Sequence, residues 1–254
     1  MKAAIADGRW PPTPTPENAR TRRGAAGLLF ALLLTCPAPA TAAVGASLSV
    51  LNDDIFRGRS LGDGRPVAIG DLSYDDLSGF YIGGSASGLA TRHSGTQLLG
   101  LQAYAGYAHQ VGSGPTLDAG IINARYTHYY SGGAGVDYTE LYAGIITGHI
   151  SSHIRYSPHY LGIRRPTVYG DVDGVVTPWD KWRLNAHAGL LVQAGGPTPL
   201  HGTRQRYDWR ISVSREIGRF SLQLGWAGSG PGRDYYAGSP HGRSSFLAGA
   251  TYIF

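Results

Sequence analysis

Cysteine, charged residues and long apolar runs are all scarce in this chain of 254 residues. The single cysteine is Cys36, close to the N-terminus, so a domain that follows it cannot be held by disulfide bonds. Charged residues make up 15% of the sequence, which is low for a soluble enzyme of this size. No apolar stretch approaches the roughly twenty residues that a membrane-spanning helix needs. These absences exclude a disulfide-rich secreted module and a helical membrane protein.

Glycine and tyrosine are abundant instead, with 38 and 16 residues. The glycines follow no three-residue period and are interleaved with β-branched and aromatic residues, which excludes collagen and favours β structure. The formal net charge is +5, but much of the surplus of basic residues lies before residue 24. The other basic residues form no stripe, and we therefore expect no binding to nucleic acid.

The first 42 residues are typical of an N-terminal extension followed by a secretory signal peptide. A basic segment, Arg20 to Arg23, precedes an apolar run of about ten residues, and Ala40-Thr41-Ala42 fits a cleavage site. A lipoprotein start at Cys36 fits less well, because a threonine precedes the cysteine. We expect residues 1–42 to be removed on export and residues 43–254 to form the mature domain.

Alternation of apolar and polar side chains in the mature domain predicts strands with two different faces. From Trp182 to Val192, apolar side chains take every second position, while Arg183, Asn185 and His187 lie between them. Segments of this kind are about nine to eleven residues long and carry aromatic residues at their ends, as tilted strands that cross a bilayer do. Strands in soluble sandwiches are usually about five or six residues long.

We predict twelve such strands, and hence an all-β fold: a transmembrane, antiparallel, up-and-down β-barrel over residues 43–254. The strand centres are expected near residues 50, 70, 83, 103, 122, 142, 154, 171, 187, 211, 223 and 249. Short and long connections alternate along the chain, which is typical of bacterial barrels with both termini in the periplasm. The phase of the alternation slips at Ile121-Ile122.

Phe254 ends the chain, and apolar residues alternate behind it at Tyr252, Ala250, Ala248 and Phe246. This pattern resembles the terminal strand of bacterial outer-membrane proteins, which ends in phenylalanine and is recognised by the assembly machinery. The resemblance implies a location in the outer membrane of a Gram-negative bacterium. Its lipid and its assembly machinery are then the expected partners.

A motif from Ile55 to Pro66 (IFRGRSLGDGRP) resembles the first-hairpin motif of the TorF-like porin family of proteobacterial outer-membrane proteins. Ser78 to Gly83 and Glu140-Leu141-Tyr142 resemble two further elements of that family. The sequence departs from the family at Asn52-Asp53-Asp54, where an aromatic residue is usual, and at Leu61, where glutamine is usual. The resemblance implies an outer-membrane barrel that acts as a channel, and it supplies no catalytic residues.

Residues opposite the apolar face of each strand must point into the lumen, and the charged ones among them are the candidate pore-lining residues. They are Arg125, Glu140, Arg155, Asp171, Asp173, Arg183, Arg210 and Glu216. Four basic residues then face four acidic ones, so we expect a narrow channel for passive diffusion of small solutes with a weak preference for anions. Twelve strands give a barrel between the filled and the open sizes. A structural or interaction barrel whose lumen is plugged by ion pairs is therefore the alternative.

A further alternative is an outer-membrane lipid hydrolase that uses His149 and Ser151. These residues lie two positions apart on one face of a predicted strand, as a base and a nucleophile could. Ile150 and Ile154 take the lipid side, however, so this face points into the lumen, whereas cleavage of lipid needs access from the bilayer. We therefore expect no enzyme activity and no cofactor. The histidines have no carboxylate at a suitable spacing, so we expect no metal site.

Overall fold

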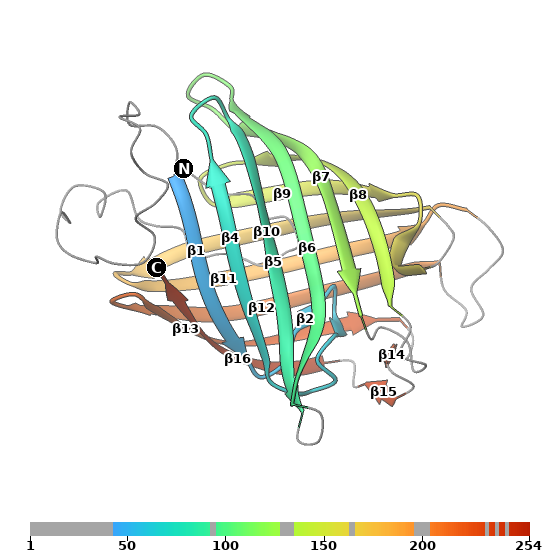
Figure 1. Cartoon of the computed structure of the whole chain (residues 1–254). Coiled ribbons are helices and arrows are strands. Elements are labelled where there is room, and N and C mark those ends of the chain that lie inside the picture. The colour runs from blue at the N-terminus through green and yellow to red at the C-terminus, as the bar shows by residue number, and fades with distance from the viewer. Residues whose placement is uncertain are drawn as a thin grey trace, which may run out of the picture.

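Twelve antiparallel strands form a closed barrel in the computed structural model (Figure 1). The structure describes residues 43–91, 95–127, 135–162, 166–195, 204–231, 234–236, 239–241 and 244–254. The barrel strands are β1 (Ala43–Leu51), β4 (Val67–Asp75), β5 (Phe80–Thr91), β6 (Gly95–Gln110), β7 (Thr116–Tyr126), β8 (Val136–Ile146), β9 (Ile150–Ser157), β10 (Thr167–Trp179), β11 (Trp182–Gln193), β12 (Gln205–Ile217), β13 (Phe220–Gly230) and β16 (Ser244–Ile253). The predicted fold class and number of strands are therefore confirmed.

The expected leader, residues 1–42, lies outside the described residues. None of the described segments forms a helix long and apolar enough to cross a membrane.

Each barrel strand pairs with the next barrel strand along the chain, and β1 pairs with β16 to close the ring. This seam runs in register from Ser47 opposite Ile253 to Leu51 opposite Gly249. Because all pairs are antiparallel, the start of β1, the end of β16 and the short connections lie at one end of the barrel, which we name the turn end. The connection from β1 to β4 lies at the opposite end, the loop end.

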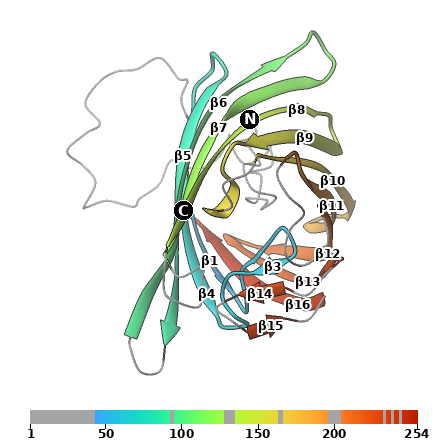
Figure 2. The ribbon, with the colours of Figure 1, turned by 90° about the vertical axis from the view of Figure 1, so that its right-hand side faces the viewer.

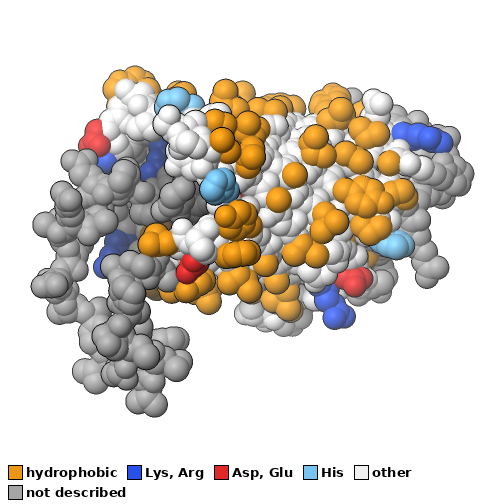
Figure 3. All heavy atoms as spheres, turned by 90° about the horizontal axis from the view of Figure 1, so that it is seen from above, with side chains coloured by type: hydrophobic (Ala, Val, Ile, Leu, Met, Phe, Trp, Pro, Cys, Tyr) orange, Lys and Arg blue, Asp and Glu red, His pale blue; other side chains and the backbone are white. Residues whose placement is uncertain are grey.

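The outer face of the barrel is apolar. Outward side chains such as Leu72, Ile154 and Ile211 are each at least 60% exposed, and orange apolar atoms cover much of the wall in Figure 3. Aromatic pairs lie near the turn end, as Phe220 with Tyr252 does, and nearer the loop end, as Trp226 with Phe246 does. An apolar band between two aromatic levels is the exterior of a barrel that faces lipid.

Inward tyrosines explain part of the high glycine content. Three of them lie directly opposite a glycine in the register of adjacent strands: Tyr81 opposite Gly106, Tyr104 opposite Gly83, and Tyr142 opposite Gly120. A Cβ on Gly106 would lie 2.2 Å from the Tyr81 hydroxyl oxygen, and one on Gly120 would lie 2.5 Å from that of Tyr142. The glycines therefore give the rings room to lie across the neighbouring strand.

Two segments at the loop end fold into the barrel. The connection after β1 forms the hairpin of β2 (Ile55–Phe56) and β3 (Arg59–Ser60), which lies inside the ring of strands in Figure 2. The turn η2 (Tyr160–Gly162) follows β9 and also lies within the ring. A separate hairpin of β14 (Asp234–Tyr236) and β15 (Ser239–His241) precedes β16. We call residues 52–66 the inserted hairpin.

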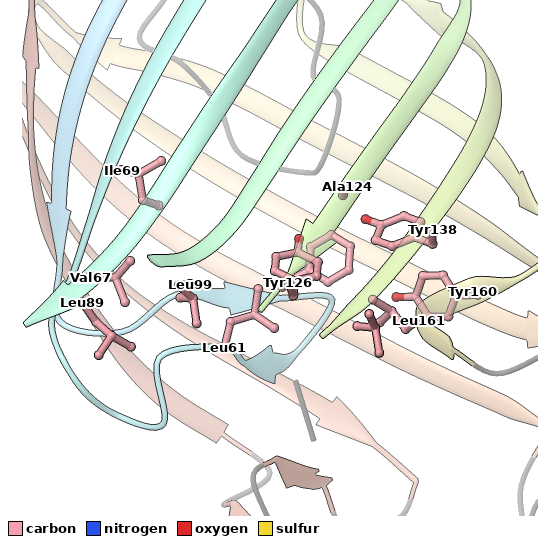
Figure 4. Packing of buried hydrophobic residues seen from close by; sticks show 12 residues of the cluster. Leu61, Val67, Ile69, Leu89, Leu99, Ala124, Tyr126, Tyr138, Tyr160 and Leu161 are labelled. Carbon is pink, nitrogen blue, oxygen red and sulfur yellow. The ribbon is translucent and has the colours of Figure 1, made fainter. Parts of the chain in front are cut away.

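The inserted hairpin has an apolar core of its own against the barrel wall (Figure 4). Phe56 and Leu61 are 1% and 0% exposed. The Phe56 ring lies 6.0 Å from the ring of Tyr126 and 6.2 Å from that of Tyr138. The loop end of the lumen is therefore packed with apolar side chains along β4 to β8.

Candidate functional site

The inner wall of the barrel holds seven of the eight predicted pore-lining residues. On their strands these seven take the inward positions of the alternation: Glu140, Arg155, Asp171, Asp173, Arg183, Arg210 and Glu216. The prediction for Arg125 was wrong. Its neighbours Ala124 and Tyr126 are buried inside, whereas Arg125 is exposed on the outer face opposite Asp137. The physical reason is that Tyr126 packs against Phe56, so the inward positions at this level are apolar.

Arg57, at the tip of the inserted hairpin, forms the central ion pair of the lumen. Its Nη1 and Nη2 atoms donate to Oε1 and Oε2 of Glu140 on β8, each at 2.7 Å. The two side chains are 6% and 1% exposed. A bidentate pair of this kind is strong and fixes both partners in direction. The hairpin is thereby attached to the far wall of the barrel.

Aromatic rings surround the same guanidinium group. The Cζ atom of Arg57 lies 4.0 Å from the ring centroid of Tyr169 on β10, 4.9 Å from that of Phe56 and 5.2 Å from that of Tyr160. Burial alone would lower the pKa of Arg57, but the charge of Glu140 outweighs it and raises the pKa above its usual range. Arg57 therefore remains a cation inside the barrel.

The backbone of the hairpin tip fits closely against β12 and β13. Arg57 and Gly58 both have positive φ angles, of 48° and 70°. The Ser229 hydroxyl donates to the Gly58 carbonyl at 3.0 Å, and a Cβ on Gly58 would lie only 2.3 Å from the Cβ of Ser229. Glycine is therefore required at the point where the hairpin touches the wall.

The base of the hairpin contains a buried carboxylate. Asp53 is 6% exposed, and its Oδ1 atom accepts a hydrogen bond of 2.8 Å from Ser60. Burial raises the pKa of Asp53, and the hydrogen bond from Ser60 offsets only part of that effect. The ionised form of Asp53 is thus unfavourable in the closed hairpin.

A network of ion pairs crosses the inner wall from β7 to β12. Its acidic members alternate with arginine or histidine side chains, and the histidines are charged only when protonated. Asp171 accepts a hydrogen bond of 2.9 Å from Arg155, and His153 lies between Asp118 at 3.4 Å and Asp171 at 3.5 Å. Further round the wall, His187 lies between Asp173 at 2.8 Å and Asp208 at 3.0 Å. Most of these groups are nearly inaccessible to solvent, so this side of the lumen is filled by its own side chains.

Other parts of the lumen are wetter. Asp71 on β4 points inward and accepts a hydrogen bond from Ser47, yet it is exposed to solvent. Arg183 pairs with Glu216, and their side chains are 15% and 26% exposed. Water therefore reaches the inner wall from the turn end, whereas the loop end is crossed by the hairpin.

A small cavity separates the hairpin tip from the wall of β10 to β13. Its volume is about 20 Å³, enough for about one water molecule. It is lined by Ile55, Arg57, Gly58, Tyr169, His187, Asp208, Trp209, Arg210 and Ala227. The hairpin tip therefore lies close against that part of the wall.

Acidic residues outnumber arginines on the described inner strand positions. The acidic ones are Asp71, Asp75, Asp118, Glu140, Asp171, Asp173, Asp208 and Glu216. The basic ones are Arg155, Arg183, Arg206 and Arg210, with His153 and His187 beside them. The expected balance of charge is therefore wrong for the strands, because Asp71, Asp75, Asp118 and Asp208 also face inward. The wall is net negative even when both histidines are protonated.

The residues of the alternative hydrolase do not meet. His149 is exposed in the turn before β9, whereas Ser151 is 0% exposed on the inner wall. The Ser151 hydroxyl has no hydrogen-bond partner among the described residues. Within the same residues, no group of three or more His, Cys, Asp or Glu is arranged to hold a metal ion.

Comparison with known proteins identifies the family of the chain. A family model described as "Bacterial protein of unknown function (Gcw_chp)" matches residues 36–247. The chain belongs to this family. No curated protein matches the sequence of this Gcw_chp member.

Porins are among the solved structures that resemble the Gcw_chp barrel. One is a NanC porin, with a TM-score of 0.54 and 10% sequence identity, covering 83% of this chain and 99% of that chain. Another is a KdgM porin, with a TM-score of 0.50 and 12% identity, covering 84% and 99%. At these identities the likeness shows that the Gcw_chp chain shares the fold of these porins.

Sequence reasoning missed Arg57, although it singled out the motif that contains it. The two partners of the ion pair belong to different motifs. Arg57 is in the first motif, and Glu140 is in a later one, 83 residues along the chain. A buried pair between them would have shown that the first connection enters the lumen.

Proposed function

We propose that the protein is an outer-membrane channel for the passive diffusion of small solutes, and that the inserted hairpin forms its constriction. The observation that carries this proposal is the hairpin itself. It crosses a closed barrel with an apolar exterior, and the Arg57–Glu140 pair attaches it to the opposite wall. Charged side chains line the water-exposed part of the lumen beneath it.

The finer identity that we propose is a TorF-like porin of a Gram-negative outer membrane. The first-hairpin motif supports it, because the motif coincides with the segment that folds into the barrel. The shared fold with NanC and KdgM porins supports a channel role. Residues 1–42 would direct export, and the outward-facing, exposed Phe254 is available to the assembly machinery.

The charge of the inner wall favours cations. Eight carboxylates face four guanidinium groups on the inner strand positions, and a narrow lumen concentrates the field of such charges on a passing ion. We therefore propose a cation preference instead of the weak anion preference expected from the sequence.

Single-channel recording in planar bilayers tests this function. We expect a small conductance and, in a salt gradient, a reversal potential of the sign for cations. Asp71→Asn should move that potential towards zero, because Asp71 is exposed on the inner wall. High salt should shrink the difference by screening. Absence of conductance both in the unchanged protein and in variants that release the hairpin would contradict the channel and favour a plugged structural barrel.

We also propose that the protein is not a lipid hydrolase. Ser151 is fully buried on the inner wall and faces away from lipid. Phospholipase or deacylase activity that Ser151→Ala abolishes would contradict this.

A further inference from the structure

The pair of Arg57 and Glu140 lies in a site with the properties of a cation receptor. Three residues outside the hairpin build it from separate elements: Glu140 on β8, Tyr160 on η2 and Tyr169 on β10. Each is at most 5% exposed. A carboxylate beside aromatic rings in a desolvated pocket is the arrangement that binds organic cations. We call these three residues the cage.

The geometry of the cage selects a planar guanidinium group over a round ammonium group. Both oxygen atoms of Glu140 accept from two different nitrogen atoms of Arg57, each at 2.7 Å. The same group lies 4.0 Å from the Tyr169 ring centroid. An ammonium group has a single nitrogen and cannot form this parallel pair of hydrogen bonds.

Arg57, which occupies the cage, belongs to a hairpin that is not part of the barrel sheet. β2 and β3 pair only with each other within the described residues and contribute nothing to the barrel ladder. If the hairpin moved, the barrel hydrogen bonds would remain, and the cage would open towards a lumen whose wall is net negative. Cationic solutes would be concentrated there.

We propose that the cage is a recognition site for solutes that carry a guanidinium group, and that Arg57 occupies it in the closed channel as a tethered substitute for them. This inference rests on the proposed channel function and names its solute class. A tethered group acts at an effective concentration of the order of millimolar or above. A solute must therefore reach a comparable concentration to displace Arg57.

The test uses Arg57→Ala, which empties the cage, in the refolded full mature barrel in detergent. Calorimetric titration with methylguanidinium chloride should show saturable binding, about tenfold tighter than with methylammonium chloride. The unchanged protein should bind far more weakly because its cage is occupied. Arg57→Ala combined with Glu140→Gln should lose the binding.

A matched control removes a different inner-wall arginine. Arg183 is also paired with a carboxylate, Glu216, but these two side chains are 15% and 26% exposed, so the pair lies in a wetter part of the lumen than the cage. Arg183→Ala should therefore not acquire the preference for methylguanidinium. Equal binding of the two cations by Arg57→Ala, or no binding by that variant when folded, would overturn the proposal.

A second variant keeps the proposal testable. If Arg57→Ala does not fold, Arg57→Lys keeps a cation in the cage, and methylguanidinium should displace its ammonium group at a lower concentration than it displaces the native guanidinium group. Equal displacing concentrations for the Arg57→Lys variant and the unchanged protein would count against the proposal. Because binding is measured without recording current, its failure can be distinguished from failure of the channel function.

Discussion

Removal of Glu140 should open the channel, and the size of the effect follows from the structure. Glu140→Ala leaves Arg57 without its buried counter-charge, which costs about 3–5 kcal/mol if the hairpin stays in place. The hairpin resists leaving because Phe56 and Leu61 are buried, and full burial of each contributes about 1.5–3 kcal/mol. These two energies are similar. The variant should therefore divide between a destabilised closed state and an open state with the hairpin outside.

The closed-to-open equilibrium should shift by about a hundredfold to a few thousandfold towards open. Single-channel recordings should show this as a higher open probability, and limited proteolysis should cut the hairpin faster. The double variant Arg57→Ala, Glu140→Ala should be less destabilised than Glu140→Ala alone, because it leaves no unpaired charge in the barrel. If Glu140→Ala changes neither the open probability nor the rate of proteolysis, the pair does not hold the hairpin.

Three further changes test other parts of the structure. Leu224→Arg on the outer face should lower the free energy of unfolding by about 2–4 kcal/mol, whereas Gln223→Arg on the inner face should have a much smaller effect in the same urea titration. Asp53→Asn should abolish a pH effect on conductance: because the pKa of Asp53 is raised, its contribution to closure is present at low pH and is lost as the pH rises through that pKa. Gly58→Ala should dislodge the hairpin tip and raise conductance, whereas Gly64→Ala, which has a similar φ but no atom near its Cβ, should leave the current unchanged. Equal effects of Leu224→Arg and Gln223→Arg would refute the assignment of the two faces, and equal effects of Gly58→Ala and Gly64→Ala would refute the close fit of the hairpin tip. The same pH profile with and without Asp53 would refute its role in closure.

The barrel could be predicted from the sequence because each strand has one face towards an apolar surrounding and one towards a polar lumen. This two-residue period gave the number of strands and the inward direction of Arg155, Asp171 and Arg210. The rule fails where the lumen is itself packed. Ile122 is 1% exposed and lies inside with Tyr81 and Tyr142, so both faces of β7 are apolar there.

This double apolarity accounts for the phase slip at Ile121-Ile122 and for the wrong direction of Arg125. The inserted hairpin is the cause at the loop end, since Tyr126 packs against Phe56. Whether a connection projects into solvent or folds into the barrel depends on contacts between residues far apart in the chain. Local alternation carries no information about such contacts, and the position of Arg57 could not be derived from it.

The attachment of the hairpin to the seam implies an order of folding events. Asn52, directly after β1, forms three hydrogen bonds with β16, the last strand. Its backbone N–H donates to the Ala248 carbonyl and its side-chain amide nitrogen donates to the Phe246 carbonyl, while its side-chain oxygen accepts from the Ala248 N–H. These partners lie almost two hundred residues away along the chain, across the seam that closes the barrel. Pairing at such a separation is slow. We therefore expect the hairpin to dock late, so that Glu140 and Arg57 lose their water only when the barrel around them is complete.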